Sequence, residues 1–371
     1  MPASNPLVAA VAALVLSAGA AAAAPPTYTL TDIGNLGGTY TSANGINAAG
    51  WITGVSYTAS NQARAFLWNG TTMQNLGTLG GSSSTGYAIN DAGVVAGSSA
   101  PNFQYIQGFL SSGGPMTNIG SLDNRYSEAN AINNSGLASG WSTNGGSHIP
   151  VVYNGSSLTP LGSLGGSYGY AWGINDAGHT TGNSYVSGNS FHHAFRHNGT
   201  TMIDLGTLGG FNSEGLDINN TGMVTGWSYD SDFNIRAFLH NGTTMINLGT
   251  LGYASRGIAL NDSGWVVGRS QDLDDGGLDH AILHDGTALF DLNDLIADSD
   301  PLKGLVTLRS ATGINNAGLI IANGSNGHAY LLTPFVAPID TPEPATLALL
   351  ATGLFGLVAA RRRKAGPSRL A

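Results

Sequence analysis

Ile46-Asn47-Ala48-Ala49-Gly50 is the first of seven copies of one short phrase: Ile-Asn (once Leu-Asn), two small or polar residues, then Gly. A repeat of roughly 40–45 residues, made of short apolar runs separated by Gly-rich turns, is typical of stacked or radial repeat architectures. The sequence therefore predicts one repeat body over residues 28–335, not several unrelated domains. The intervals between the phrases are 42 to 44 residues, with a last interval of 54, and the Asn residues are Asn47, Asn90, Asn133, Asn175, Asn219, Asn261 and Asn315.

Each repeat unit reads as four short strands. Asn47-x-x-Gly50 predicts a type I turn in which Asn bonds its own backbone and Gly takes the left-handed conformation. Asn69-Gly70, between two apolar runs, predicts a hairpin, and similar dipeptides recur in later units. No sustained helical period is found between residues 28 and 335. The body is therefore predicted to be all-β.

Four strands in each of seven units predict a seven-bladed β-propeller. The residues from Tyr28 to Leu36 resemble the fourth strand of a unit, whereas the last unit stops after its third strand, at residues 328–332. Pairing these two strands would close the ring and leave no exposed edge. An open β-solenoid and a pair of β-sandwiches are the alternatives.

The composition narrows the range of functions. The chain has 55 Gly and only 9% charged residues, which suits tight β-turns and a surface of Ser, Thr and Asn. It has no Cys, which excludes disulfides, thiolate metal sites and a Cys nucleophile. The net charge is −9, although five of the 13 basic residues lie in the C-terminal tail, so the body should not bind nucleic acid or anionic membranes.

Both ends of the chain resemble targeting segments. Residues 1–24 are predicted to be a signal peptide, because an apolar, Ala-rich run ends in small residues that fit an A-x-A cleavage site. A signal peptide normally has Lys or Arg before its apolar run, and none is present here; a start codon assigned too far downstream would explain this. The alternative to a signal peptide is an uncleaved N-terminal anchor. At the other end, residues 336–344 are a linker, residues 345–360 a predicted transmembrane helix, and residues 361–371 a basic cytoplasmic tail.

The C-terminal arrangement of Pro-Glu-Pro, a short apolar helix and an Arg cluster resembles the PEP-CTERM sorting signal of Gram-negative bacteria. The resemblance implies that an exosortase in the inner membrane processes a membrane-anchored precursor, and that the mature protein is exported to the cell surface or the extracellular matrix. It also implies an association with exopolysaccharide. The residues that carry the motif are Pro342, Glu343, Pro344, Arg361, Arg362 and Arg363.

The body resembles the HAF repeats of bacterial extracellular proteins, on the strength of His193-Ala194-Phe195 and its variants, such as Arg64-Ala65-Phe66 and His280-Ala281-Ile282. Leu-Gly-x-Leu-Gly-Gly accompanies them at residues 76–81, 161–166 and 205–210. The family implies an extracellular repeat protein without a known activity. Since Arg replaces His and cannot ligate a metal, a structural role is expected, in which the side chain donates to a neighbouring loop carbonyl.

The variable loops between the second and third strands of each unit are the expected binding surface, because function on a repetitive scaffold usually resides in its loops. Aromatic rings beside amides and carboxylates suit sugars, whose C–H faces stack on them while their hydroxyls form hydrogen bonds. In the alternative interpretation these aromatics only shield the blade ends. The predicted ligand-binding residues are Tyr57, Phe103, Tyr105, Tyr185, Phe191, Tyr229 and Phe233.

One acidic stretch is a candidate metal site. Asp272, Asp274, Asp275 and Asp279 lie within eight residues that include two Gly, and their oxygens could surround a Ca²⁺ ion. The spacing of an EF-hand is missing, and a solvated acidic loop is the alternative. No other cofactor is expected.

No catalytic set is evident in the sequence. Glu128 and Glu214 are the two Glu residues of the body, and neither a nucleophile motif nor a phosphate-binding loop accompanies them. We therefore expect an exported, non-enzymatic surface or matrix protein that binds carbohydrate or a protein partner through its loops. A purely structural matrix component is the second reading, and a carbohydrate-active enzyme the third.

Overall fold

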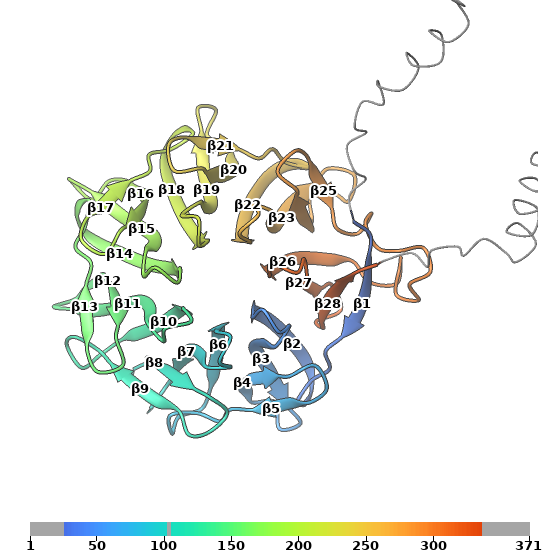
Figure 1. Ribbon diagram of the computed structural model, residues 1–371, viewed down its shortest axis with the longest axis horizontal. Helices are drawn as coiled ribbons and strands as arrows, with labels where there is room; N and C mark the ends of the chain where they lie inside the picture. The colour runs from blue at the N-terminus through green and yellow to red at the C-terminus, as the bar shows by residue number, and fades with distance from the viewer. Residues whose placement is uncertain (1–25, 102–104, 336–371) are drawn as a thin grey trace, which may run out of the picture. The chain divides into compact units, whose positions relative to one another are not determined.

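Seven four-stranded antiparallel sheets stand around a central channel in the computed structural model of the chain, which describes residues 26–101 and 105–335 (Figure 1). Each sheet is one blade of a β-propeller. The predicted all-β, seven-bladed propeller is confirmed. The predicted signal segment, C-terminal linker, transmembrane helix and basic tail lie outside the described residues.

Blades I to VI each use four consecutive strands, and the strand nearest the channel comes first. Blades I and II comprise β2 (Gly37–Ile46), β3 (Ile52–Thr58), β4 (Ala63–Trp68), β5 (Met73–Asn75), β6 (Ser84–Ile89), β7 (Val95–Ser99), β8 (Gln107–Ser111) and β9 (Thr117–Gly120). Blades III and IV comprise β10 (Ser127–Ile132), β11 (Ala138–Asn144), β12 (Ser147–Tyr153), β13 (Leu158–Pro160), β14 (Gly165–Ile174), β15 (Thr180–Val186), β16 (His192–His197) and β17 (Met202–Asp204). Blades V and VI comprise β18 (Gly209–Ile218), β19 (Val224–Asp230), β20 (Ile235–His240), β21 (Met245–Asn247), β22 (Gly252–Leu260), β23 (Val266–Asp272), β24 (Asp279–His284) and β25 (Leu289–Asp291).

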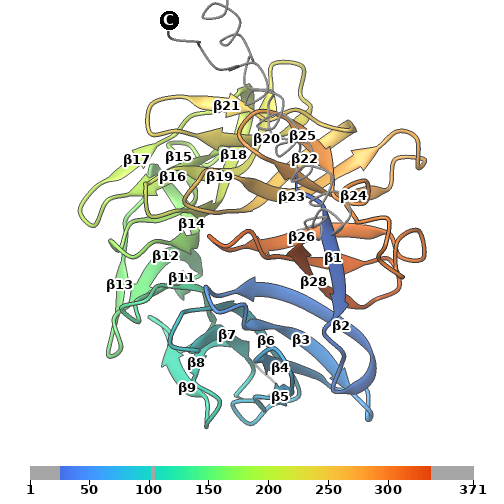
Figure 2. The same cartoon turned by 45° about the vertical axis from the view of Figure 1, so that its right-hand side comes forward.

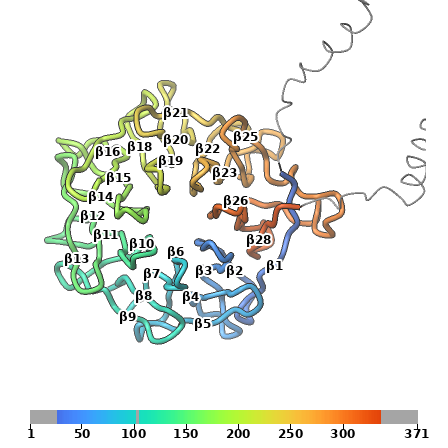
Figure 3. The backbone as a smooth tube through the Cα atoms, viewed as in Figure 1, coloured from blue at the N-terminus to red at the C-terminus, as the bar shows by residue number. Residues whose placement is uncertain are grey.

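Blade VII combines the two ends of the body. Its first three strands are β26 (Leu308–Ile314), β27 (Ile320–Gly324) and β28 (Ala329–Pro334), and its fourth is β1 (Tyr28–Asp32) from the start of the chain. β1 runs antiparallel to β28 with Leu30 opposite Leu332, and the two strands lie side by side in Figures 2 and 3. The predicted closure by the N-terminal strand is thereby confirmed.

The segment between β25 and β26 explains the last interval of 54 residues, because its extra length covers the outer edge of β1. The amide of Tyr28 donates to the carbonyl of Leu295 (2.8 Å), and the amide of Ala297 donates back to the carbonyl of Tyr28 (2.8 Å). A carboxylate oxygen of Asp300 accepts the amide N–H of Leu30 at 2.6 Å. An edge strand that would otherwise expose unpaired backbone groups is thus partly protected.

Glycine is required where the first two strands of a blade approach each other. A Cβ atom on Gly54 would lie 1.9 Å from the carbonyl oxygen of Ser42, which no packing adjustment relieves. Large apolar side chains then fill the space between blades, among them the fully buried rings of Phe66, Phe109, Phe195 and Phe238 on the third strands. The repeat therefore alternates backbone contact within a blade and aromatic packing between blades.

The Asn of each repeated turn also forms a hydrogen bond to the next blade, which the sequence does not predict. As expected, Asn47 Oδ1 accepts the amide N–H of Trp51 (2.8 Å) and Gly50 has a left-handed φ of 80°. In addition, Asn47 Nδ2 donates to the carbonyl of Asn90 in the next blade (3.1 Å). All seven blades repeat this bond at 2.9 to 3.5 Å, and Asn315 closes the circle by donating to Asn47. We call this circle the amide ring.

A second circle lies beside the amide ring. The backbone N–H of Ala48 donates to a carboxylate oxygen of Asp91 in the next blade. Five further bonds follow from a backbone N–H to the side-chain oxygen of an Asn or Asp in the next blade, and all six measure 2.9 Å. Asp and Asn alternate around this circle, with Ala in blade I, and the members are Ala48, Asp91, Asn134, Asp176, Asn220, Asp262 and Asn316. We call it the alternating ring.

The His and Arg residues of the HAF-like phrases lie on the third strands or, in the case of His328, directly before one. Arg64 donates to the loop carbonyl of Ser82 (2.7 Å), as predicted. The His residues differ from the prediction, since His193 contacts the carboxylate of Asp204 at 2.9 Å and His328 that of Asp32 at 2.7 Å. A strand-four carboxylate, not a loop carbonyl, is their partner because it lies directly beside the third strand.

Candidate functional site

A cleft of about 350 Å³ lies between blades IV and V. Side chains on an inner strand point the same way at every second residue, so Tyr168, Tyr170 and Trp172 of β14 form one wall. The cleft lies toward the side of the propeller that carries the turns between second and third strands, which we call the loop face. The remaining lining residues are Asn183, Tyr185, His192, Glu214 and Trp227.

The rings of the cleft contact one another in sequence around its wall. Tyr170 and Trp172 are stacked, with centroids 5.6 Å apart and planes 9° apart. Tyr185 packs edge-on against Tyr168 (6.0 Å) and tilted against His192 (5.4 Å). These contacts fix the orientation of rings that would each have freedom to turn on an isolated strand, so the aromatic surface is held in one arrangement.

Polar groups lie among these rings. Trp227 donates its indole N–H to a carboxylate oxygen of Glu214 (2.9 Å), and Trp172 donates to the amide oxygen of Asn183 (3.2 Å). Burial raises the pKa of Glu214 above its usual range, and burial lowers the pKa of His192. The guanidinium of Arg256 lies over the ring of Trp227, 4.6 Å from its centroid.

The same Glu–Trp arrangement occurs in blade III. Trp141 donates its indole N–H to Glu128 (3.0 Å), and burial raises the pKa of that carboxyl as well. His148 packs against Trp141 at 4.6 Å, and its Nδ1 lies 2.5 Å from the hydroxyl oxygen of Tyr170. An aromatic surface therefore continues from blade III into the cleft.

Several of the predicted ligand-binding residues gather at or near the cleft. Tyr185 lines it, and Tyr229 packs edge-on against the cleft residue Trp227 at 5.7 Å. Phe191 and Phe233 stack on opposite sides of Phe211, at 5.0 and 4.9 Å, and the three rings are 40 to 58% exposed. We call these three residues the Phe stack.

Other predicted residues lie elsewhere. Tyr57 packs edge-on against Tyr40 in blade I (5.4 Å), and Tyr105 packs against Tyr126 (5.0 Å). Phe103 lies outside the described residues. The sequence prediction missed Trp172, Glu214 and Trp227, because it considered only loops and these side chains come from strands.

The acidic stretch does not gather its four carboxylates around one point. Asp279 forms an ion pair with Arg269 (3.0 Å), and Asp275 forms one with Arg309 (2.8 Å). Asp274 donates its backbone N–H to a carboxylate oxygen of Asp272 (3.0 Å). His280, which the sequence prediction did not include, lies between Asp272 and Asp275 instead.

Comparison with known proteins identifies one sequence feature. Residues 340–364 match the PEP-CTERM protein-sorting motif, and this range includes all six predicted sorting residues, which lie outside the described part of the chain. No curated protein matches the chain. The protein is thus a seven-bladed β-propeller with a PEP-CTERM sorting motif. This motif implies export, sorting to the cell surface and processing by an exosortase.

Solved structures give a distant likeness. TolB from Acinetobacter baumannii is 13% identical with a TM-score of 0.45, over 76% of this chain and 63% of that one. A protein described as a TolB from Agrobacterium tumefaciens is 11% identical with a TM-score of 0.40, over 65% and 79%. A puromycin hydrolase mutant complexed with PGG is 12% identical with a TM-score of 0.46, over 85% and 54%. The chain therefore spans less than two thirds of the length of the first of these proteins.

Among the described residues, none forms a helix of the length and hydropathy needed to cross a bilayer.

Proposed function

We propose that this protein is an exported, non-enzymatic component of the cell surface or extracellular matrix, and that it binds carbohydrate in the cleft between blades IV and V. The observation that carries the proposal is the composition of that cleft, in which five Tyr and Trp rings surround an amide and a carboxylate. A volume of about 350 Å³ is at the lower end of the range for small-molecule sites, which suits one or two sugar rings.

The chemistry of the cleft fits a sugar better than an apolar ligand. The C–H face of a pyranose can lie against the stacked pair of Tyr170 and Trp172, while its hydroxyls reach Glu214 and Asn183. Each of these two polar groups already accepts one indole N–H and has acceptor capacity left over. A fully apolar ligand would leave this remaining capacity unused and would take the carboxylate further out of water.

The two glutamates support a binding role over an enzymatic one. Glycoside hydrolysis needs two carboxyl groups at about 5–9 Å on either side of one bond. Glu128 belongs to blade III and Glu214 to blade V, with blade IV between them, and each is fixed by the tryptophan of its own blade. We therefore propose that these residues position a ligand and do not cleave it.

The sorting motif supports the proposed location. We propose that an exosortase cleaves near Pro342-Glu343-Pro344, that the mature protein reaches the surface or matrix of a Gram-negative cell, and that exopolysaccharide is its carbohydrate partner. The body would then be a HAF-repeat protein. The intact mass of protein recovered from the host tests the processing: a chain that keeps residues 345–371 in the inner membrane would overturn it.

A purely structural matrix role is the second candidate, and the Phe stack favours it. Phe191, Phe211 and Phe233 expose three adjoining apolar rings on the loop face. Such a patch suits contact with another protein better than contact with a sugar, because the rings offer no hydrogen bonds.

Binding of the exported protein to the host exopolysaccharide, and to neutral, acidic and amino polysaccharides, tests the proposal by affinity electrophoresis. Tyr185→Ala should weaken binding by about 5- to 150-fold, since one stacking ring contributes about 1–3 kcal/mol by analogy with stacked bases. Tyr57→Ala is the matched control, because Tyr57 is the last-but-one residue of the second strand in blade I, as Tyr185 is in blade IV. Equal affinities of both variants, or retention on no polysaccharide, would contradict carbohydrate binding in this cleft.

A further inference from the structure

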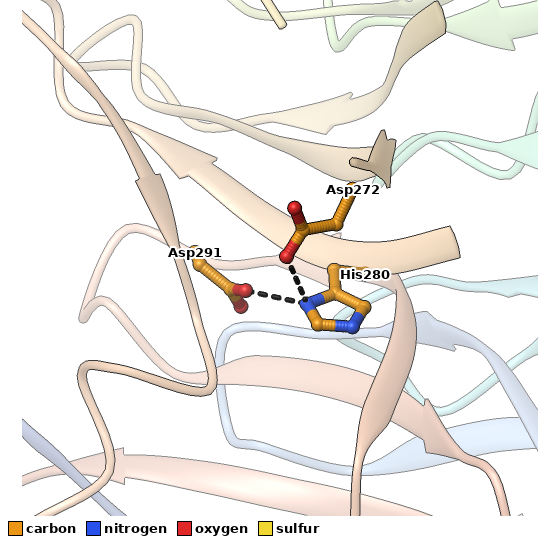
Figure 4. Close-up of side chains that lie close together, drawn as sticks. All are labelled: Asp272, His280 and Asp291. Carbon is orange, nitrogen blue, oxygen red and sulfur yellow. Dashed lines mark hydrogen bonds and ion pairs between the residues drawn. The ribbon is translucent and has the colours of Figure 1, made fainter. Parts of the chain in front are cut away.

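His280 is surrounded by carboxylates from three sides in blade VI. Its Nδ1 atom lies 2.5 Å from Asp291 Oδ2 and 3.5 Å from Asp272 Oδ2 (Figure 4). The three side chains come from the end of β23, the start of β24 and the end of β25. The possible ligand atoms of Asp272, His280 and Asp291 all lie within 4.8 Å of one another. The imidazole is nearly buried, with 11% of its side chain exposed.

The backbone and a neighbouring amide hold both carboxylates in place. Asp272 Oδ1 accepts the N–H of Asp274 (3.0 Å), and Asp291 Oδ1 accepts the backbone N–H and the side-chain amide of Asn293, both at 2.8 Å. These bonds occupy one oxygen of each group. The second oxygen, Oδ2, is therefore the one that faces His280 Nδ1 in each case.

The other ring nitrogen of His280 has a separate carboxylate partner. Nε2 lies 3.0 Å from Asp275 Oδ2, and Arg309 holds the same oxygen at 2.8 Å. A metal-bound His usually donates its free ring N–H to such a carboxylate, which fixes the tautomer and the ring orientation. With the Nε2 proton directed at Asp275, the Nδ1 lone pair faces two carboxylate oxygens. A positive charge stabilises that arrangement: a proton on Nδ1 would serve Asp291 alone, at 2.5 Å, whereas a metal ion would contact both carboxylates.

Other blades contain parts of this cluster. His193 with Asp204 and His328 with Asp32 repeat the pairing of a His with a fourth-strand Asp. The backbone position of Asp272, which donates its N–H across the turn, is occupied by Val186 in blade IV and by Asp230 in blade V, where Asp230 pairs with Arg236 at 3.3 Å. Among the described blades, blade VI therefore combines a His with both carboxylates, whereas blade V has an Arg, which cannot ligate a metal, in place of the His.

We propose that Asp272, His280 and Asp291 bind one divalent first-row transition-metal ion, with Zn²⁺ as the reference ion, and that Asp275 orients the His from outside. An imidazole nitrogen with two carboxylates suits such an ion, whereas Ca²⁺ prefers an all-oxygen set. Bonds of about 2.0–2.2 Å need ligand atoms about 3–3.5 Å apart, so Asp272 is already well placed and Asp291 must withdraw by up to about 1 Å. The site goes beyond the proposed function, because it would link the ends of three strands within blade VI, whereas the proposed sugar site lies between blades IV and V.

The test uses the full chain, stripped of metal with a chelator and then titrated with Zn²⁺ by calorimetry and with Co²⁺ by visible absorption. We expect one strong site per chain, a higher unfolding midpoint with Zn²⁺, and much weaker binding of Ca²⁺. Asp272→Val, which copies the residue of blade IV, should weaken Zn²⁺ binding at least tenfold. Asp275→Asn should weaken it about 10- to 100-fold, as loss of an outer carboxylate typically does.

Asp204→Asn in blade IV is the matched control, since it breaks a His–Asp pair of the same geometry and should leave the metal stoichiometry unchanged. Absence of a Co²⁺ spectrum in the wild-type chain would overturn the proposal without any variant. So would tighter binding of Ca²⁺ than of Zn²⁺, or equal Zn²⁺ affinity of the wild type and Asp272→Val. Loss of the strong site in Asp204→Asn instead would assign the metal to blade IV.

Discussion

Removing one link of the amide ring should destabilise the propeller more than removing an outer turn of the same blade. In Asn175→Ala, two bonds of a side chain that is 4% exposed are lost. Nδ2 no longer donates to the carbonyl of Asn219 (3.0 Å), and Oδ1 no longer accepts the amide of His179 (2.9 Å). The carbonyl of Asn219 keeps a second partner, Gly222, whereas the amide of His179 loses the turn acceptor.

The magnitude follows from these two losses. A replaceable hydrogen bond contributes about 1 kcal/mol and an orphaned, partly buried donor costs about 1–3 kcal/mol, so the expected loss is about 2–4 kcal/mol. For a body of about 300 residues the unfolding entropy is about 0.6 kcal/mol/K, which converts this loss into a fall of about 3–6 °C in the thermal midpoint.

Asn198→Ala is the matched control, because Asn198 caps the exposed outer turn of the same blade with bonds to Thr200 and Thr201. It should lower the midpoint by about 1–2 °C, since water replaces exposed bonds at little cost. Calorimetry of both variants in one buffer is the assay. Equal shifts for Asn175→Ala and Asn198→Ala would refute the idea that the links between blades carry stability.

Three further predictions concern single sites. Burial raises the pKa of Glu214, so the protonated form favours folding, and this stabilisation is lost as the pH rises through the raised pKa. In thermal melts, Glu214→Gln should therefore be more stable than the wild type at pH 7 and should lose that advantage at pH 4. His193→Arg should lower the thermal unfolding midpoint, and adding Asp204→Asn should restore part of the loss, since other blades combine Arg with Asn at these two positions. If the effects of the two substitutions on stability simply add in the double variant, the two positions are not coupled. Ala48→Asn should raise the midpoint, because the new side chain can accept the backbone N–H of Asn316; a lower midpoint would show that the site has no room.

Much of the fold could be predicted from the sequence, because the signals were local. The Asn47-x-x-Gly50 turn and the Asn69-Gly70 hairpin each specify their own backbone, and seven repetitions specify the blade number. The pairing of the N-terminal strand at Tyr28 with the last blade could be predicted by counting the strands in each unit. The bond from each turn to the next blade could not be predicted in this way, because a local motif leaves the Nδ2 atom of Asn unassigned.

The candidate cleft was predicted only in part. Loop reasoning found Tyr185 but not Trp172, although the alternation Tyr168-x-Tyr170-x-Trp172 places three rings on one side of a strand and is a readable signal. The partnership of Trp227 with Glu214 depends on which residues face each other across two strands. That register is set by tertiary pairing and only becomes apparent once the strands are aligned.

The sequence also contained a signal for the contacts between the His and Asp residues of the third and fourth strands. His193 and Asp204 are eleven residues apart, as are His280 and Asp291, and Arg64 has Asn75 at the same distance. Because the two residue types change together from blade to blade, comparing repeats within the one chain would have indicated the contact.

The alternating ring has a consequence that is a matter of parity. Two residue types can take turns around a circle without fault only if the number of places is even, and a propeller of seven blades has an odd number. One place must therefore differ, and Ala48 in blade I occupies it, next to the blade where the chain closes. With Asp at that place, two carboxylates would become neighbours at Asp91; with Asn, two amides would become neighbours at Asn316. A propeller of six or eight blades built on this plan would need no such exception.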